Sequence, residues 1–116
     1  MKQNAAFWLA LDRLAASSGV VIDRPKGTRH PKYPDMLYEV DYGYLKNTSS
    51  MDGNGIDVWR GTDPEQRIDA VMCIVDLTKR DSEIKLLIGC TREERDKIYQ
   101  LHNGSENMKG ILILRD

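Results

Sequence analysis

The chain has 116 residues, of which 41% are hydrophobic and 30% are charged. This length can close one hydrophobic core without disulfides or metal ions, so we expect a single domain over residues 1–116. The 17 basic and 18 acidic residues give a formal charge of -1, which argues against a nucleic-acid partner and an anionic lipid surface. No apolar run approaches the roughly 18 residues of a membrane span, and the first residues lack the basic-then-apolar arrangement typical of a secretory signal. We therefore expect a cytoplasmic protein with no membrane partner.

The first half of the chain predicts one helix and two strands. Apolar residues at helical spacing predict an amphipathic helix over residues 4–16, which either packs over the core or binds a partner. A short apolar strand at 20–22 leads into a basic, proline-rich loop that ends at Pro34. Aromatic and β-branched residues favour a strand over 36–45, and the turn formers of 46–55 predict a long polar loop.

The second half predicts three more strands and a second helix. Strand patterns recur at 56–59, 68–77 and 84–88, and Thr91 begins a capping box that predicts the helix. The apolar run 111–114 is either a last strand or a docked tail, because periodicity does not distinguish the two. Closure into a barrel would remove the exposed edges of such short strands. We therefore predict an α+β, mainly β fold: a small OB-like, five-stranded closed barrel with flanking helices.

The polar loop contains the most informative acidic cluster. Asp52, Asn54 and Asp57 lie close together on a glycine-rich turn. Glycine lets the backbone fold so that both carboxylates can face one point, and carboxylate oxygens are the ligands that Mg²⁺ prefers. The alternative is an ordinary polar hairpin loop, because the same residue types are common in turns.

A second acidic group, Asp76, Asp81 and Glu83, follows the long central strand, with Lys85 nearby. Alone these residues are typical of solvated strand ends. In a barrel that returns on itself, they could complete a coordination sphere opened by the polar loop.

The basic loop from Arg24 to Tyr33 concentrates positive charge, including Lys26 and Lys32. Cations that face an acidic metal site would neutralise a polyphosphate from the other side. The alternative is a solvated loop that aids solubility. His30 in this loop and His102 near a helix end are more typical of structural or exposed histidines than of catalytic ones.

These motifs resemble the signature of soluble family I inorganic pyrophosphatases. In that family an Asp-x-Asp-x-x-Asp motif follows a Tyr-Gly-Tyr or Tyr-Gly-Phe element. Here Tyr42-Gly43-Tyr44 precedes Asp52-Gly53-Asn54-Gly55-Ile56-Asp57-Val58. Upstream, Ile22-Asp23-Arg24-Pro25 and Pro31-Lys32-Tyr33 are similar to the acidic-x-Pro and Lys-Tyr-Glu elements of the family.

The resemblance continues downstream and covers the chain from about Val20 to the C-terminus. Asp76 and Asp81 keep the separation of two further metal-binding aspartates of the family. The resemblance implies the family's five-stranded barrel, Mg²⁺ as cofactor with Mn²⁺ or Co²⁺ as alternatives, pyrophosphate as substrate, and a homo-oligomer.

The resemblance also implies three groups of site residues. Catalytic roles fall to Asn54, Asp57, Tyr42 and Asp23. Substrate binding falls to Lys32, Tyr42, Lys85, Arg24 and Lys26. Metal binding falls to Asp52, Asp57, Asp81, Asp76 and Glu83.

Three departures from the family pattern bear on these roles. Asn54 replaces the middle aspartate, and an amide can orient a water molecule but cannot take its proton at neutral pH. The stretch before Tyr42 is too short for the hairpin that carries the family's phosphate-binding arginine, and His102-Asn103 replaces a Tyr-Lys pair. Lys85 is displaced, so Asp81 and Glu83 compete for one ligand position, where we favour Asp81.

Three functions follow from these observations. The first is metal-dependent hydrolysis of pyrophosphate or a related small phosphoanhydride. The second is a pyrophosphatase-derived protein that binds metal and phosphate with little or no turnover. The third is binding of single-stranded nucleic acid through the basic loop and four tyrosines, which the near-zero net charge disfavours. The four are Tyr33, Tyr38, Tyr42 and Tyr44.

Overall fold

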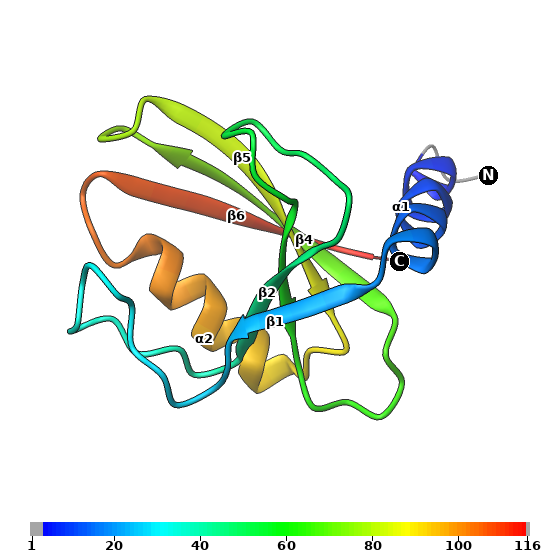
Figure 1. Cartoon of the computed structure of the whole chain (residues 1–116), viewed down its shortest axis with the longest axis horizontal. Coiled ribbons are helices and arrows are strands. Elements are labelled where there is room, and N and C mark those ends of the chain that lie inside the picture. Colours follow the sequence, from blue (N-terminus) through cyan, green and yellow to red (C-terminus); the bar gives the residue numbers. More distant parts are fainter. Residues whose placement is uncertain (1–3, 116) are drawn as a thin grey trace.

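The computed structural model of the chain describes residues 4–115, which form two helices and a six-stranded mixed sheet (Figure 1). The elements in chain order are α1 (Ala5–Ser18), β1 (Val20–Arg24), β2 (Asp41–Leu45), β3 (Asp57–Arg60), β4 (Ile68–Asp76), β5 (Asp81–Ile88), α2 (Arg92–Asn103) and β6 (Met108–Leu114). The apolar run 111–114 is thus part of a strand. Neither helix has the length and apolar character needed to cross a membrane.

The strands pair in the order β1-β2-β3-β5-β4-β6, so the expected closed barrel of five strands is wrong. Only β3 and β5 pair in parallel. Within the described chain β1 and β6 lie at opposite ends of the sheet, and part of the β6 edge is already occupied. The side-chain amide of Asn103 in α2 donates to the carbonyl of Gly110 and accepts from its N–H, each at 3.1 Å. These bonds use backbone groups that closure of the sheet would need.

The strand expected over 36–45 exists only from Asp41 onward. Before it, the backbone of Tyr38 bonds to the basic loop, donating to the carbonyl of Thr28 at 2.9 Å and accepting from the N–H of Gly27 at 2.8 Å. The side chain of Tyr38 is buried in the core. The aromatic pattern therefore reflects burial beside a folded loop rather than a continuous strand.

The two faces of the sheet carry separate apolar clusters. One face packs against α2 through Ile98 and includes Trp59 and Leu87. The other packs against α1 through the buried Trp8. The packing role expected for the first helix is therefore confirmed.

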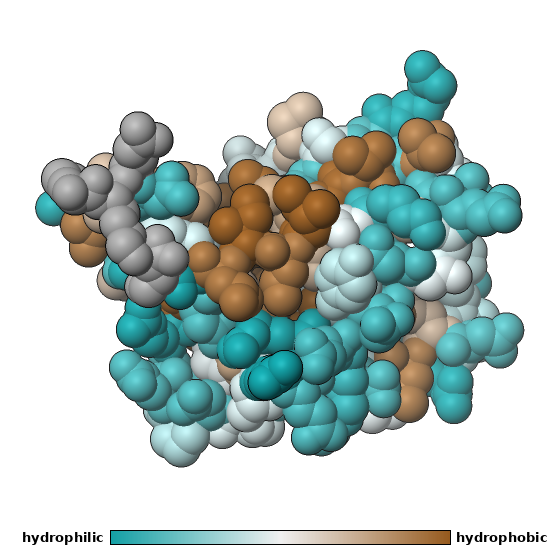
Figure 2. All heavy atoms as spheres, turned by 180° about the vertical axis from the view of Figure 1, so that it is seen from behind, coloured by the Kyte–Doolittle hydropathy of each residue, from teal (hydrophilic) through white to brown (hydrophobic). Residues whose placement is uncertain are grey.

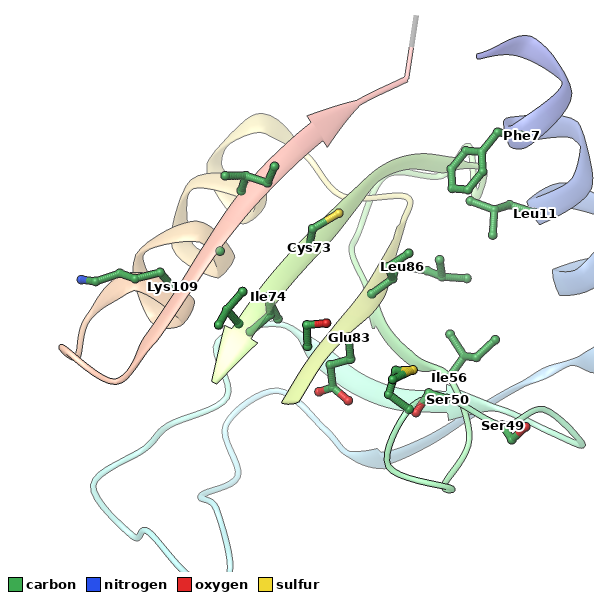
Figure 3. Close-up of a pocket in the computed structure, with 16 residues that line it drawn as sticks. Phe7, Leu11, Ser49, Ser50, Ile56, Cys73, Ile74, Glu83, Leu86 and Lys109 are labelled. Carbon is green, nitrogen blue, oxygen red and sulfur yellow. The ribbon is translucent and has the colours of Figure 1, made fainter. Parts of the chain in front are cut away.

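Helix α1 covers only one end of its face of the sheet. Beside it lies an open apolar groove of about 830 Å³, bordered by Phe7 and Leu11 (Figure 3). Figure 2 shows apolar side chains gathered on this side of the molecule. Ile84 of β5 and Ile111 of β6, the latter 62% exposed, contribute to the groove.

Helix α2 begins and ends with specific polar contacts. Its first turn has the expected capping box, because Thr91 accepts a bond from the N–H of Glu94 and the Glu94 carboxylate accepts from the N–H of Thr91. At the other end, the buried His102 accepts a bond from the indole N–H of Trp59 at 3.2 Å between the two ring nitrogens. This bond anchors α2 to β3.

His102 makes the free energy of unfolding depend on pH. Burial, with a smaller contribution from the nearby Lys85 charge, lowers the pKa of His102 from 6.5 to about 3. Below pH 6.5 the unfolded chain therefore binds a proton that the folded chain does not. The contribution of His102 is complete above this value and is lost between pH 6.5 and about 3, by about 1.4 kcal/mol per pH unit.

The matched variant is His102→Gln, whose amide oxygen can still accept the indole bond but does not titrate. We expect the native chain to lose about 2 kcal/mol more than the variant between pH 7 and pH 5, measured by urea unfolding. Equal losses would show that His102 is not the titrating group.

Candidate active site in the cleft beside α2

A cleft of about 960 Å³ lies on the face of the sheet that carries α2. Ten of the twelve site candidates line it, so residues far apart in the sequence meet at one surface. The ten are Asp23, Arg24, Tyr42, Asp52, Asn54, Asp57, Asp76, Asp81, Glu83 and Lys85. Of the described residues predicted to serve the site, only Lys26 and Lys32 lie outside the cleft lining, on the exposed part of the basic loop.

Strand pairing explains why these residues meet. The antiparallel pairing of β2 with β3 sets Tyr44 opposite Asp57 and Tyr42 opposite Trp59. The parallel pairing of β3 with β5 sets Val58 opposite Leu86, which brings Asp57 beside Lys85. Because side chains alternate along a strand, every second residue of β5 then faces the cleft.

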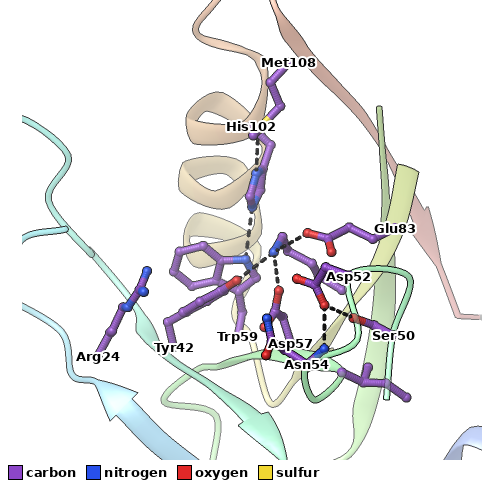
Figure 4. A network of polar contacts seen from close by, with 12 residues as sticks. Arg24, Tyr42, Ser50, Asp52, Asn54, Asp57, Trp59, Glu83, His102 and Met108 are labelled. Carbon is purple, nitrogen blue, oxygen red and sulfur yellow. Dashed lines mark hydrogen bonds and ion pairs between the residues drawn. The ribbon is translucent and has the colours of Figure 1, made fainter. Parts of the chain in front are cut away.

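Lys85 is the centre of the site. Its ammonium nitrogen lies 2.6 Å from the Tyr42 hydroxyl, 2.6 Å from Asp57 Oδ2 and 3.0 Å from Glu83 Oε1 (Figure 4). The residue is only 6% exposed. An ammonium group has three N–H donors, so these three acceptors satisfy it completely.

The charges around Lys85 keep it protonated. Burial alone would lower the pKa of Lys85, but the negative charge of Asp57 and the hydrogen bonds to Asp57 and Tyr42 outweigh this effect and raise the pKa above its ordinary value. Burial also raises the pKa of Tyr42, so its hydroxyl stays protonated at neutral pH. The site therefore holds a fixed ammonium beside a neutral phenol.

Two of the other aspartates are held by their own loops. Asp52 Oδ1 accepts bonds from the backbone N–H of Asn54 at 2.9 Å and from the Ser50 hydroxyl at 2.8 Å, and these bonds lower the pKa of Asp52. Asp76 Oδ1 accepts from the N–H groups of Thr78 and Lys79, each at 3.0 Å. Each of these carboxylates thus shapes a turn at the edge of the cleft.

The donor chemistry of the cleft fits a hard divalent cation, because six carboxylates line it. The geometry is not assembled for one: among residues 4–115 no three acidic, histidine or cysteine side chains are grouped to hold a metal ion. The Lys85 ammonium binds both Asp57 and Glu83, and so takes the position that a cation would need. The acidic residues therefore line one cleft, but they are not arranged as ligands of one metal ion.

Glu83, and not Asp81, forms an ion pair with the same Lys85 ammonium as Asp57 does. Asp81 lies opposite Asp76 in the backbone register of β4 and β5, next to the turn that joins the two strands. Both side chains also line the cleft. The single-residue spacing between Glu83 and Lys85, with both on one face of β5, is the signal that could have favoured Glu83.

Trp59 and Lys79 are among the cleft residues that were not assigned to the site from the sequence. Trp59 lies two residues after Asp57 on β3, so strand alternation alone places both on one face. Lys79 lies in the basic turn after β4, and its charge contributes to lowering the pKa of Asp52. The strand pattern could therefore have identified Trp59, whereas Lys79 lies outside any strand.

The sequence matches no family model and no curated protein. Among solved structures, the chain is similar to an inorganic pyrophosphatase from Neisseria gonorrhoeae, with a TM-score of 0.60 and 19% identity over 78% of this chain and 77% of that one. It is also similar to an inorganic phosphatase from Anaplasma phagocytophilum, with a TM-score of 0.55 and 16% identity over 82% of this chain and 81% of that one. At this identity the likeness concerns the fold alone. The chain therefore has a pyrophosphatase-like fold.

Proposed function

We propose that this chain is a divalent-cation-dependent hydrolase that cleaves pyrophosphate or a related small phosphoanhydride into phosphate. The observation that carries the proposal is the gathering of six carboxylates, Arg24 and Lys85 around one cleft of a pyrophosphatase-like fold. In this proposal the chain is a single domain that forms a homo-oligomer and acts in the cytoplasm.

Asp52, Asp57 and Glu83 are the residues proposed to hold the cation, with Asp76 and Asp81 as further ligands. A divalent cation such as Mg²⁺, Mn²⁺ or Co²⁺ would supply charge neutralisation for the phosphoryl oxygens and make a nearby water molecule more acidic. For Asp57 and Glu83 to bind it, their contacts with Lys85 must loosen.

The remaining candidate residues would bind the substrate and orient the attacking water. The Asn54 amide orients the attacking water, while Asp23 adds an acidic group at the opposite side of the cleft. Arg24 supplies positive charge to the phosphate oxygens, because within residues 4–115 only one of its five N–H donors is used, in a bond to the Tyr38 hydroxyl. Lys85 and the Tyr42 phenol hold Asp57 in place and meet the substrate when the ion pairs rearrange. Lys26 and Lys32, outside the cleft lining, would act only after movement of their loop.

In the reaction, water adds to one phosphorus atom while the bond from that phosphorus to the bridging oxygen breaks. The bridging oxygen leaves with the second phosphate, and the protons of the water pass to the products and solvent. No protein group needs to become covalently bound.

A second candidate function is metal and phosphate binding with little turnover. Two observations favour it: Asn54 cannot act as a base, and Lys85 neutralises the carboxylates that a cation would use. This alternative predicts metal-dependent phosphate binding without phosphate release.

The direct test is phosphate release from pyrophosphate with Mg²⁺, Mn²⁺ or Co²⁺, compared between the native chain and Asp57→Ala. We expect metal-dependent turnover that falls at least about a hundredfold in the variant, because the substitution removes a proposed ligand. The matched control is Asp96→Ala, which removes an exposed carboxylate from α2 and leaves turnover unchanged. Full turnover in Asp57→Ala would contradict the site, and phosphate binding without turnover in the native chain would favour the binding function.

Lys85→Met tests whether the ammonium occupies the cation position. Without it, Asp57 and Glu83 are free to bind an ion, so we expect Mn²⁺ affinity in the absence of substrate to rise at least about tenfold. Electron paramagnetic resonance of free Mn²⁺ measures this, and near-ultraviolet circular dichroism reports folding. Lys79→Met removes a cleft cation from another position as a control. Equal Mn²⁺ affinities in all three proteins would refute the competition.

A further inference from the structure

Part of the cleft lining is a row of aromatic rings that cleavage of pyrophosphate does not use. Tyr33, His30 and Tyr38 follow one another, with ring centroids 5.0 Å apart for the first pair and 6.4 Å for the second. Tyr38 then stacks on Tyr42 at 5.3 Å, and Tyr42 contacts Lys85. A continuous row of rings thus leads from the cleft mouth to the centre of the site.

The outer two rings do not belong to the core. Tyr33 is 64% exposed, whereas Tyr38 is 1% exposed. His30 is held in place because its Nδ1 accepts the backbone N–H groups of Lys32 at 3.0 Å and Tyr33 at 3.3 Å. Burial and the charges of Arg24 and Lys32 lower the pKa of His30, so its ring is neutral. A fixed neutral ring beside an exposed tyrosine provides a surface on which a flat group can stack.

The cleft is much larger than pyrophosphate. Its volume of about 960 Å³ is at the upper end of the roughly 300–1,000 Å³ found for pockets that hold drug-sized ligands. The volume extends from the acidic residues past Arg24 to Tyr33. The space therefore suits a ligand with a phosphoanhydride at one end and a flat group at the other.

The positive charge of Arg24 determines how such a ligand would be oriented along the cleft. Arg24 lies between the two ends, with its guanidinium 5.5 Å from the centre of the Tyr38 ring. A guanidinium in this position can pair with a phosphate, while the outer rings accept the face of a nucleobase. Stacking on aromatic side chains tolerates different bases, because each has a π-face.

We propose that the cleft binds a nucleoside triphosphate, with the base stacked on Tyr33 and His30 and the phosphate chain directed past Arg24 toward Asp57. This inference rests on the proposed function, since it places the scissile anhydride in the same acidic region. It narrows the substrate class from small phosphoanhydrides to nucleotides.

The experiment measures binding of two non-hydrolysable probes with Mg²⁺ by calorimetry: adenosine 5′-(β,γ-imido)triphosphate and imidodiphosphate. In the native chain we expect the nucleotide analogue to bind at least about fivefold more tightly than imidodiphosphate. Tyr33→Ala removes this difference and leaves imidodiphosphate affinity unchanged, whereas Tyr33→Trp retains it. Tyr99→Ala removes an exposed aromatic ring from α2, outside the cleft lining, and changes neither affinity.

Each outcome separates this inference from the proposed function. Equal binding of the two probes to the native chain, or an unchanged nucleotide affinity in Tyr33→Ala, overturns the nucleotide inference alone when imidodiphosphate still binds. Loss of affinity for both probes in Tyr33→Ala also overturns it, because the ring then supports the phosphate site rather than a base. Failure of both probes to bind the native chain overturns the proposed function as well.

Discussion

The buried ammonium of Lys85 is the interaction on which the arrangement of the cleft depends. It joins Tyr42 of β2, Asp57 of β3 and Glu83 of β5, three strands that are neighbours in the sheet. Because a buried charge is costly unless it is paired, removal of any partner leaves an uncompensated group in a largely dry place. The three strands therefore hold their polar side chains in one orientation, and the acidic residues are presented as a group.

The same ammonium also determines the charge at the centre of the site. It pairs with both Asp57 and Glu83 in the absence of another cation, and this pairing offsets part of the repulsion between the two carboxylates. An incoming divalent cation must compete with a group that is already covalently tethered in place. A substrate that brings additional negative charge would favour this exchange, because it offers new partners to both cations.

The aromatic rings connect this polar centre to the core and to solvent. Trp59 and Tyr42 pack together with ring centroids 4.5 Å apart, and Trp59 also bonds to His102 of α2. Toward solvent, the row continues through Tyr38 to the basic loop. Packing of α2 and of the loop therefore determines the shape of the cleft, although neither contributes the central carboxylates.

The sequence by itself determined the local elements and the polar groups available to the cleft. The capping box at Thr91, the strand patterns and the glycine-rich turn around Asp52 depend on neighbouring residues. The structure contains the capping box, the turn and a strand in each predicted region, although the strand expected over 36–45 begins only at Asp41. Asp57 and the second acidic group line one cleft, and their role as metal ligands stays a prediction.

Tertiary structure alone decided how these pieces meet. The number of strands and the openness of the sheet depend on pairing between distant segments, above all the parallel contact of β3 with β5 and the bonding of Asn103 to the edge of β6. The same pairing placed Glu83 beside Asp57 and left Lys26 and Lys32 outside the cleft lining. Local patterns do not encode such contacts, because periodicity specifies which face of a strand is buried but not which strand lies next to it.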